Sequence, residues 1–252
     1  MGTPTSVILQ GLGPMGREIV KALQTDPHFT LAGVVDIDPS LVGTSLGTHG
    51  LEPAEIVISD HLDPAQDGDI LIHATGSYLE SVTPQIEKAL SMGFYVVSTC
   101  EELSFPFFRH PDLSQRLNIS AQNQGLAVVG TGVNPGFLMD RLPLSMTTVC
   151  HSIRSIEVTR VQNPLTRRVP FQTKVGVNLA KSEFDTLANR GSFGHVGLEE
   201  SARLIAEGLG WDISDWSHDL KPVLSEDQKI VRGLVESLKA RTTDGRFISL
   251  RF

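Results

Sequence analysis

The sequence predicts an α/β protein with a doubly wound parallel sheet, followed by a second, α+β domain whose sheet is largely antiparallel. Three observations lead to this prediction. Residues 6–38 have the pattern strand, glycine turn, helix, strand; strand-like and helical segments then alternate as far as Gly130; and beyond Asp140 apolar and polar residues alternate singly. We therefore expect two domains, at residues 1–140 and 141–252.

The glycine turn lies between the first strand and the first helix. The apolar run at residues 7–9 ends at GLGPMG, residues 11–16, and residues 31–35 form a second strand that Asp36 ends. A G-x-G-x-x-G turn alone is weak evidence, because many glycine turns are purely structural. Here the motif leaves a strand, opens a helix and precedes an acid by about 20 residues, which is the complete dinucleotide fingerprint. The first domain is therefore predicted to be a Rossmann-type domain.

The chemistry of the turn predicts how it binds a cofactor. The phosphates would lie against the helix N-terminus, where free N–H groups and the helix dipole favour negative charge. Asp36 would accept hydrogen bonds from the adenosine ribose, and no Arg or Lys follows it to bind a 2′-phosphate. This favours NAD, with NADP as the alternative. The predicted contacts are Gly11, Gly13, Pro14, Met15, Gly16 and Asp36.

The rest of the first domain continues the alternation. We expect a helix or loop at 39–50, strands at 56–58, 69–76, 94–99 and 126–130, and helices at 78–92 and 113–123. In a parallel sheet the carboxyl ends of the strands share one edge, and ligands bind there. The turns at 74–77, 99–102 and 132–136 should therefore join the glycine turn, which adds Ala74, Thr75, Gly76, Ser77, Thr99 and Cys100 to the cofactor contacts.

The second domain has fewer clear signals. The alternation at 155–161 predicts a half-solvated antiparallel strand, and helices are expected at 181–189 and 198–208. Residues 229–239 also fit a helical face, so their periodicity leaves helix and strand open. A turn at 243–246 then leads to a final strand at 247–252.

Composition limits the classes of partner. The formal net charge is −8 and the basic residues are scattered, so no patch for nucleic acid or a membrane surface is expected. No apolar run approaches a membrane span, and the first strand leaves no room for a signal peptide. Two cysteines, Cys100 and Cys150, indicate a reducing compartment and a cytoplasmic protein. No HExxH or paired CxxC suggests a metal site.

Two adjacent acids are the first candidates for catalysis. Glu101 and Glu102 follow a strand at the predicted crevice, where a carboxylate could act as general acid or base; alternatively they cap the next turn. Alternation does not say which of them faces the cofactor. His195 lies in a glycine-flanked turn and could be a structural hydrogen-bonding group or a pocket residue. Arg160 could bind a substrate carboxylate or be a solvated cation.

Five stretches of sequence carry a resemblance to a known family. They are GLGPMG at 11–16, HATGS at 73–77, STCEELSFP at 98–106, GVNPGF at 132–137 and GHVGL at 194–198. Together they resemble 2,4-diaminopentanoate dehydrogenase and the native amine dehydrogenases, whose cofactor half is similar to that of 4-hydroxy-tetrahydrodipicolinate reductase. The resemblance covers nearly the whole chain, and CEE and GVNPGF are more specific than the glycine turn.

The resemblance implies NAD(P)-dependent oxidative deamination of an amine, or reductive amination of a carbonyl with ammonia. One glutamate of the CEE pair would hold ammonia, assist loss of water from the carbinolamine and stabilise the iminium that accepts hydride. It also implies a homodimer built through the second domain's sheet. Asn134, Pro135 and Gly136 would steer the nicotinamide carboxamide, and Phe137, Arg160, Asn163 and His195 would line the substrate pocket.

One departure from the family keeps two alternatives open. Family members continue well past the point where this chain ends at Phe252, so we expect a short natural form, a fragment, or an active-site wall supplied by another subunit. One alternative is a cyclic-imine reductase of the dipicolinate type, although its histidine- and lysine-rich loop is not found. The other is a cofactor-binding protein without turnover, because the C-terminal stretch is missing.

Overall fold

The chain forms two compact units, Met1–Gly132 and Val133–Phe252, in a computed structural model. It describes residues 3–65, 69–167, 169–188, 194 and 196–252. The boundary precedes the one expected at residue 140. Buried Asp140 explains this difference, because its carboxylate accepts hydrogen bonds from Gly136 N and Ser201 Oγ, both at 2.7 Å, and so ties residues 133–140 to the second unit.

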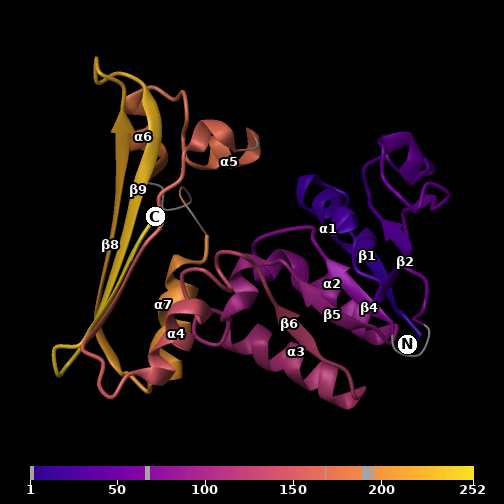
Figure 1. The fold of residues 1–252 in the computed structure, drawn as a ribbon, viewed down its shortest axis with the longest axis horizontal. Coiled ribbons are helices and arrows are strands. Elements are labelled where there is room, and N and C mark those ends of the chain that lie inside the picture. The colour runs from indigo at the N-terminus through magenta and orange to yellow at the C-terminus, as the bar shows by residue number, and fades with distance from the viewer. Residues whose placement is uncertain (1–2, 66–68, 168, 189–193, 195) are drawn as a thin grey trace. The chain divides into compact units, whose positions relative to one another are not determined.

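A six-stranded parallel sheet organises the first unit (Figure 1). Its strand order, β3-β2-β1-β4-β5-β6, has the reversal beside β1 that defines a doubly wound sheet, so the predicted fold class is confirmed. The strands are β1 Thr5–Gln10, β2 Phe29–Val35, β3 Ile58–Ser59, β4 Ile70–His73, β5 Tyr95–Ser98 and β6 Val128–Gly130.

Two separate cores cover the two faces of this sheet. Helices α2 (Leu79–Ser91) and α3 (Pro111–Asn123) pack on one face, and α1 (Pro14–Gln24) with the 3₁₀ turn η1 (Leu46–His49) packs on the other. The apolar spacing of α2 places Val82, Ile86 and Leu90 in the first core. Both faces of the sheet are therefore buried. The loops that follow the strands at the carboxyl edge lie outside these two cores.

The second unit is built on a four-stranded sheet with the order β7-β10-β9-β8 (Figure 1). Its strands are β7 Ser155–Thr159, β8 Ile213–Leu224, β9 Val231–Thr242 and β10 Phe247–Arg251. The segment left undecided at 229–239 is therefore mainly strand, since β9 pairs with β8 and β10 on either side. The prediction that β7 is antiparallel was wrong: it pairs with β10 in parallel. Alternation reports one solvated face of a strand, and it carries no information on strand direction.

Helix α7 (Leu198–Leu209) covers one face of this sheet. Leu198, Ala202 and Ile205 contact Leu238, Ala240, Ile248 and Leu250 in the core of the unit. The remaining helices and turns are α4 Arg141–Met146, η3 Thr147–Val149, η4 Pro164–Thr166, α5 Val169–Lys174 and α6 Lys181–Ala188. The predicted end of α6 at residue 189 lies outside the described residues. Within the described part of the chain, no helix is long and apolar enough to span a bilayer.

Candidate active site

The glycine turn is shaped by close contacts that exclude side chains. Gly11 has φ +99°, and a Cβ atom there would lie 2.7 Å from the carbonyl oxygen of Ala74. A Cβ atom on Gly16 would overlap the carbonyl oxygen of Gly11. Gly13 differs, because a Cβ atom at this position would meet no atom within 4 Å, so the space beside it is open. The turn therefore packs tightly on one side and leaves room on the other for a ligand.

The first turn of α1 supplies the donors for an anion. Pro14 occupies the first helical position, and the helix begins its own bonding with Arg17 N, 3.0 Å from Gly13 O. The N–H groups of Met15 and Gly16 precede that bond, in the part of a helix where N–H groups have no helical acceptor. A phosphate is the ligand that such an array favours.

Asp36 joins the end of β2 to the glycine turn. Its Oδ2 accepts a hydrogen bond from Leu12 N at 2.6 Å, and its Oδ1 accepts one from Asp38 N at 2.9 Å. Each carboxylate oxygen has a second lone pair that can accept a ribose hydroxyl. Asp36 therefore fits both a structural role in the turn and the predicted role in cofactor recognition.

The β4 and β5 loops are tied together at the same edge. The carbonyl oxygen of Ser77 accepts hydrogen bonds from Cys100 Sγ and from Glu102 N, both at 3.2 Å. Thr99 N donates to His73 O at 2.9 Å. Burial raises the pKa of the Cys100 thiol to about 11, so this residue is not an activated nucleophile. The loops at 74–77 and 99–102 thus form one surface with the glycine turn, as predicted for neighbouring parallel strands.

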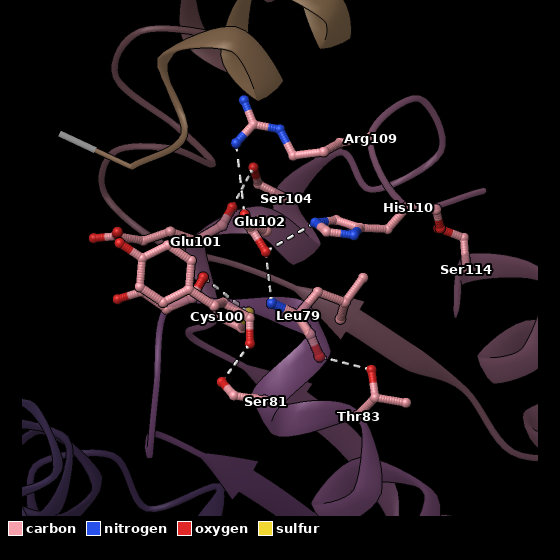
Figure 2. Close-up of polar contacts among 12 residues, drawn as sticks. Leu79, Ser81, Thr83, Cys100, Glu101, Glu102, Ser104, Arg109, His110 and Ser114 are labelled. Atoms are coloured by element: carbon pink, nitrogen blue, oxygen red, sulfur yellow. Dashed lines mark hydrogen bonds and ion pairs between the residues drawn. The ribbon is translucent and has the colours of Figure 1, made fainter. Parts of the chain in front are cut away.

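The side chain of Glu102 binds the N-terminal ends of two helices (Figure 2). This side chain is 5% exposed. Oε2 accepts hydrogen bonds from Leu79 N, the first residue of α2, at 2.7 Å and from His110 Nε2, on the residue before α3, at 3.0 Å. Arg109 forms a longer ion pair with Oε1 at 3.6 Å. A negative charge is favoured at both helix N-termini, so the position of Glu102 fits a structural role.

Glu101 has a different environment. It is the first residue of the 3₁₀ turn η2 (Glu101–Ser104), and it is less buried than Glu102. Figure 2 shows its side chain leaving the turn in the direction away from His110 and Arg109. Gly130 of β6 packs closely against this turn, because a Cβ atom on residue 130 would overlap the carbonyl oxygen of Leu103. Residue 130 must therefore be glycine for the turn to sit there.

The second unit contains the other predicted cofactor loop. Asn134, Pro135 and Gly136 lie between the first unit and α4, and Asp140 holds them by accepting from Gly136 N. Pro135 packs against Gly197 so closely that a Cβ atom there would overlap the proline ring. The roles of these three residues in cofactor binding stay predictions.

The predicted substrate residues are also in the second unit. Phe137 is 51% exposed. Arg160 lies 5.6 Å from the ring centroid of Phe252, and burial together with nearby Arg167 lowers the pKa of Arg160. Asn163 is used locally, because its Oδ1 accepts from Leu165 N at 3.0 Å and caps η4. His195 lies outside the described residues.

Several residues at these sites were not predicted. They are His73 and Gln85 beneath the β4 loop, His110 beside Glu102, and Asp140 with Ser201 in the second unit. Each acts through a partner on another element or loop, 8 to 61 residues away in sequence. The only local signal was a polar residue in an apolar strand, which His73 provides at the end of β4. Among the described residues no group of His, Cys, Asp and Glu is arranged to hold a metal ion.

Comparison with known proteins finds a family match in each half of the chain. Residues 5–100 match the dihydrodipicolinate reductase N-terminus, and residues 137–236 match the 2,4-diaminopentanoate dehydrogenase C-terminal domain. Over 240 residues the chain is 28% identical to the 2,4-diaminopentanoate dehydrogenase of Acetoanaerobium sticklandii, covering 92% of this chain and 68% of that protein.

Two further matches differ in extent. The 4-hydroxy-tetrahydrodipicolinate reductase of Mastigocladus laminosus is 45% identical over 65 residues, which cover 25% of this chain and 23% of that protein. The amine dehydrogenase structure from Mycobacterium smegmatis superposes with a TM-score of 0.82 at 20% identity, covering 98% of this chain and 78% of that one, which establishes the fold. The chain thus joins an N-terminal domain that matches the dihydrodipicolinate reductase family to a C-terminal domain that matches the 2,4-diaminopentanoate dehydrogenase family, and the resemblance predicted from its motifs is confirmed.

Proposed function

We propose that this protein is an NAD(P)-dependent oxidoreductase that acts on CH–NH₂ groups. It would deaminate an amine oxidatively to a carbonyl compound and ammonia, or catalyse the reverse reductive amination. The observation that carries the proposal is the match of residues 137–236 to the C-terminal domain of 2,4-diaminopentanoate dehydrogenase, in a chain whose first unit has a complete dinucleotide turn. Matches to 4-hydroxy-tetrahydrodipicolinate reductases cover 24% to 58% of this chain, compared with 92% for the 2,4-diaminopentanoate dehydrogenase. The cyclic-imine alternative therefore has less support.

The residues of the first unit fit a dinucleotide. The open space beside Gly13 and the N–H groups of Met15 and Gly16 suit a diphosphate, and Asp36 suits the ribose of NAD. NADP is the alternative cofactor. When bound, the nicotinamide accepts hydride during deamination and donates it during amination.

We assign the acid and base role to Glu101. Because Glu102 is held by three donors, its carboxylate is poorly placed to exchange a proton with a substrate, whereas Glu101 leaves the turn away from those donors. In the aminating direction, the Glu101 carboxylate would take a proton from ammonium as the amine adds to the carbonyl. It would return that proton to the hydroxyl group that leaves the carbinolamine as water.

The second unit supports a substrate that carries a carboxylate. Arg160 and Arg167 have no acidic partner among the described residues, and they lie over the rings of Phe252 and Phe171 at 5.6 Å each. The two rings contact each other edge to face, with centroids 6.1 Å apart. Two guanidinium groups beside an aromatic pair favour an organic anion.

The assembly and location proposed here follow from the same resemblance. We expect a cytoplasmic homodimer that pairs through the sheet of the second unit, whose face opposite α7 carries Ser237, Lys239 and Arg241 on β9. Light scattering during gel filtration tests the dimer, and a monomer at micromolar concentration would contradict it.

The decisive experiment follows NADH formation with a panel of short-chain amines, matched amines that carry a carboxylate, and 2,4-diaminopentanoate. Calorimetry on the same protein measures binding of NADH and NADPH. Turnover of an amine supports the proposal, and reduction of a cyclic imine without amine turnover would favour the reductase alternative. Tight NADH binding without any turnover would favour the alternative of a cofactor-binding protein that is not an active enzyme.

Glu101→Gln tests the assignment of the acid and base. We expect turnover to fall at least about 100-fold, the usual effect of losing an acid–base group, with NADH affinity retained. Glu80→Gln removes an exposed carboxylate from the first turn of α2 and is the matched control, with turnover unchanged. Full activity of Glu101→Gln would show that the assignment is wrong.

A further inference from the structure

A row of polar residues crosses the first sheet directly beneath the two loops at its carboxyl edge. Gln10, His73 and Ser98 are the last residues of β1, β4 and β5, and the strand register pairs Gln10 with His73 and His73 with Ser98. His73 and Ser98 are both 0% exposed. Such a row is unusual inside a parallel sheet covered on both faces, because buried polar groups are stable only when they are hydrogen-bonded.

The hydrogen bonds of His73 determine which ring nitrogen carries the hydrogen. Its Nε2 lies 2.8 Å from Thr75 Oγ1 and 3.1 Å from Gln85 Oε1, and its Nδ1 lies 2.9 Å from Ser98 Oγ. An amide oxygen can only accept, so Nε2 carries the hydrogen. Burial lowers the pKa of His73, which keeps the ring neutral, and Nδ1 therefore accepts from the Ser98 hydroxyl.

These hydrogen bonds connect the imidazole of His73 to both loops. On one side Nε2–H points to Thr75 in the β4 loop, and Thr75 Oγ1 donates to Gln85 Oε1 at 2.8 Å. On the other side the Ser98 oxygen, which donates to Nδ1, accepts from Cys100 N at 3.1 Å. Cys100 immediately precedes Glu101, so the ring links the loop predicted to contact the cofactor to the turn that carries the proposed acid.

We propose that His73 is a positioning residue for both loops. Its Nε2 side sets the β4 loop for cofactor binding, and its Nδ1 side sets the backbone at Cys100 and thereby the direction of Glu101. The first half of this proposal concerns cofactor binding alone, and the second half rests on the proposed function. The opposing view is that the row only stabilises the core, and the two views predict different kinetics.

The test compares three variants by NADH affinity, kcat, KM and thermal midpoint. Ser98→Ala removes the Nδ1 side, because the bond to Nδ1 and the bond from Cys100 N are both lost. We expect kcat to fall about tenfold with NADH Kd within about twofold. His73→Leu removes both sides, so NADH Kd should also rise about tenfold. Thr83→Val is the matched control: its hydroxyl is equally buried and donates to Leu79 O at 2.7 Å outside the row, so it should lower only the thermal midpoint.

Conservative rescue separates positioning from packing. Ser98→Thr keeps a hydroxyl at the same place and should recover most of kcat. If His73→Leu and Ser98→Ala behave like Thr83→Val, with kcat and NADH Kd unchanged, the proposal is wrong. Should His73→Leu fail to fold, Ser98→Ala with its rescue still decides the Nδ1 side. If the unmodified protein binds NADH and turns over no amine, the proposed function fails, and the NADH Kd of His73→Leu against Thr83→Val decides the cofactor side.

Discussion

Replacing Glu102 with alanine should destabilise the first unit strongly. The substitution removes the acceptor of Leu79 N at the start of α2 and the partner of His110 before α3. Hydrogen bonds to a charged group contribute about 1.5–3 kcal/mol each, and these two are not additive because they share one oxygen. Arg109 is 42% exposed on its side chain, so its ion pair adds less than about 1 kcal/mol. We expect a loss of about 3 kcal/mol in the free energy of unfolding.

Urea unfolding with two intrinsic probes measures this loss. Both tyrosines, Tyr78 and Tyr95, lie in the first unit, and both tryptophans, Trp211 and Trp216, lie in the second. The loss should appear in the transition that tyrosine reports. Arg109→Ala is the control and should cost less than about 1 kcal/mol. If Glu102→Ala costs no more than Arg109→Ala, the carboxylate does not hold the two helices, and Glu102 would be as good a candidate for the acid and base as Glu101.

Three further predictions test the cofactor turn and the second unit. Gly13→Ala should leave the thermal midpoint unchanged but raise NADH Kd at least about tenfold, because the new Cβ atom enters the open space predicted for the diphosphate. Gly233→Ala, at an uncrowded glycine of the second unit, is the control for the calorimetric Kd. Asp36→Asn keeps an acceptor for Leu12 N and loses the charge, so NADH should bind about tenfold more weakly relative to NADPH, and an unchanged ratio would contradict the ribose role. The hydrogen bond to Glu236 raises the pKa of His218 above 6.5, so its stabilisation is complete below that pH and is lost as the pH rises through the raised pKa; His218→Gln should cost more at about pH 6 than at about pH 8, and urea midpoints showing the reverse would refute the pairing.

The parts of the fold that sequence could predict are those set by local pattern. The β1-α1-β2 unit follows from an apolar run, a glycine turn with Pro14 at the first helical position, and a second apolar run. Helix α7 follows in the same way from its apolar spacing and from Gly210, which ends it in the left-handed conformation. In these segments the signal and its structural cause lie within a few residues of each other.

The parts that were wrong or left open depend on distant partners. The direction of β7 is set by β10, which joins it in parallel from the other end of the unit. The apolar spacing of residues 229–239 also fits a helix, but pairing with β8 and β10 on either side makes them mainly strand. Likewise no pattern near Glu101 shows that Glu102 reaches Leu79 and His110, since those contacts exist only after two helices have been placed.

The two glutamates show why adjacency in sequence does not imply a shared role. In a 3₁₀ turn successive side chains point about 120° apart, so a pair of acids on η2 cannot both face the same partners. Glu102 enters the space between the N-termini of α2 and α3, where Leu79 N and His110 Nε2 hold its carboxylate. Its backbone N–H donates to Ser77 O and fixes the turn there. Glu101 is then presented on a turn that is already rigid. A general acid or base needs that combination, because it must exchange a proton without losing its position. Under the proposed assignment, the buried acid fixes the turn that carries the less buried one, and exchanging the roles of Glu101 and Glu102 would require α2 and α3 to move.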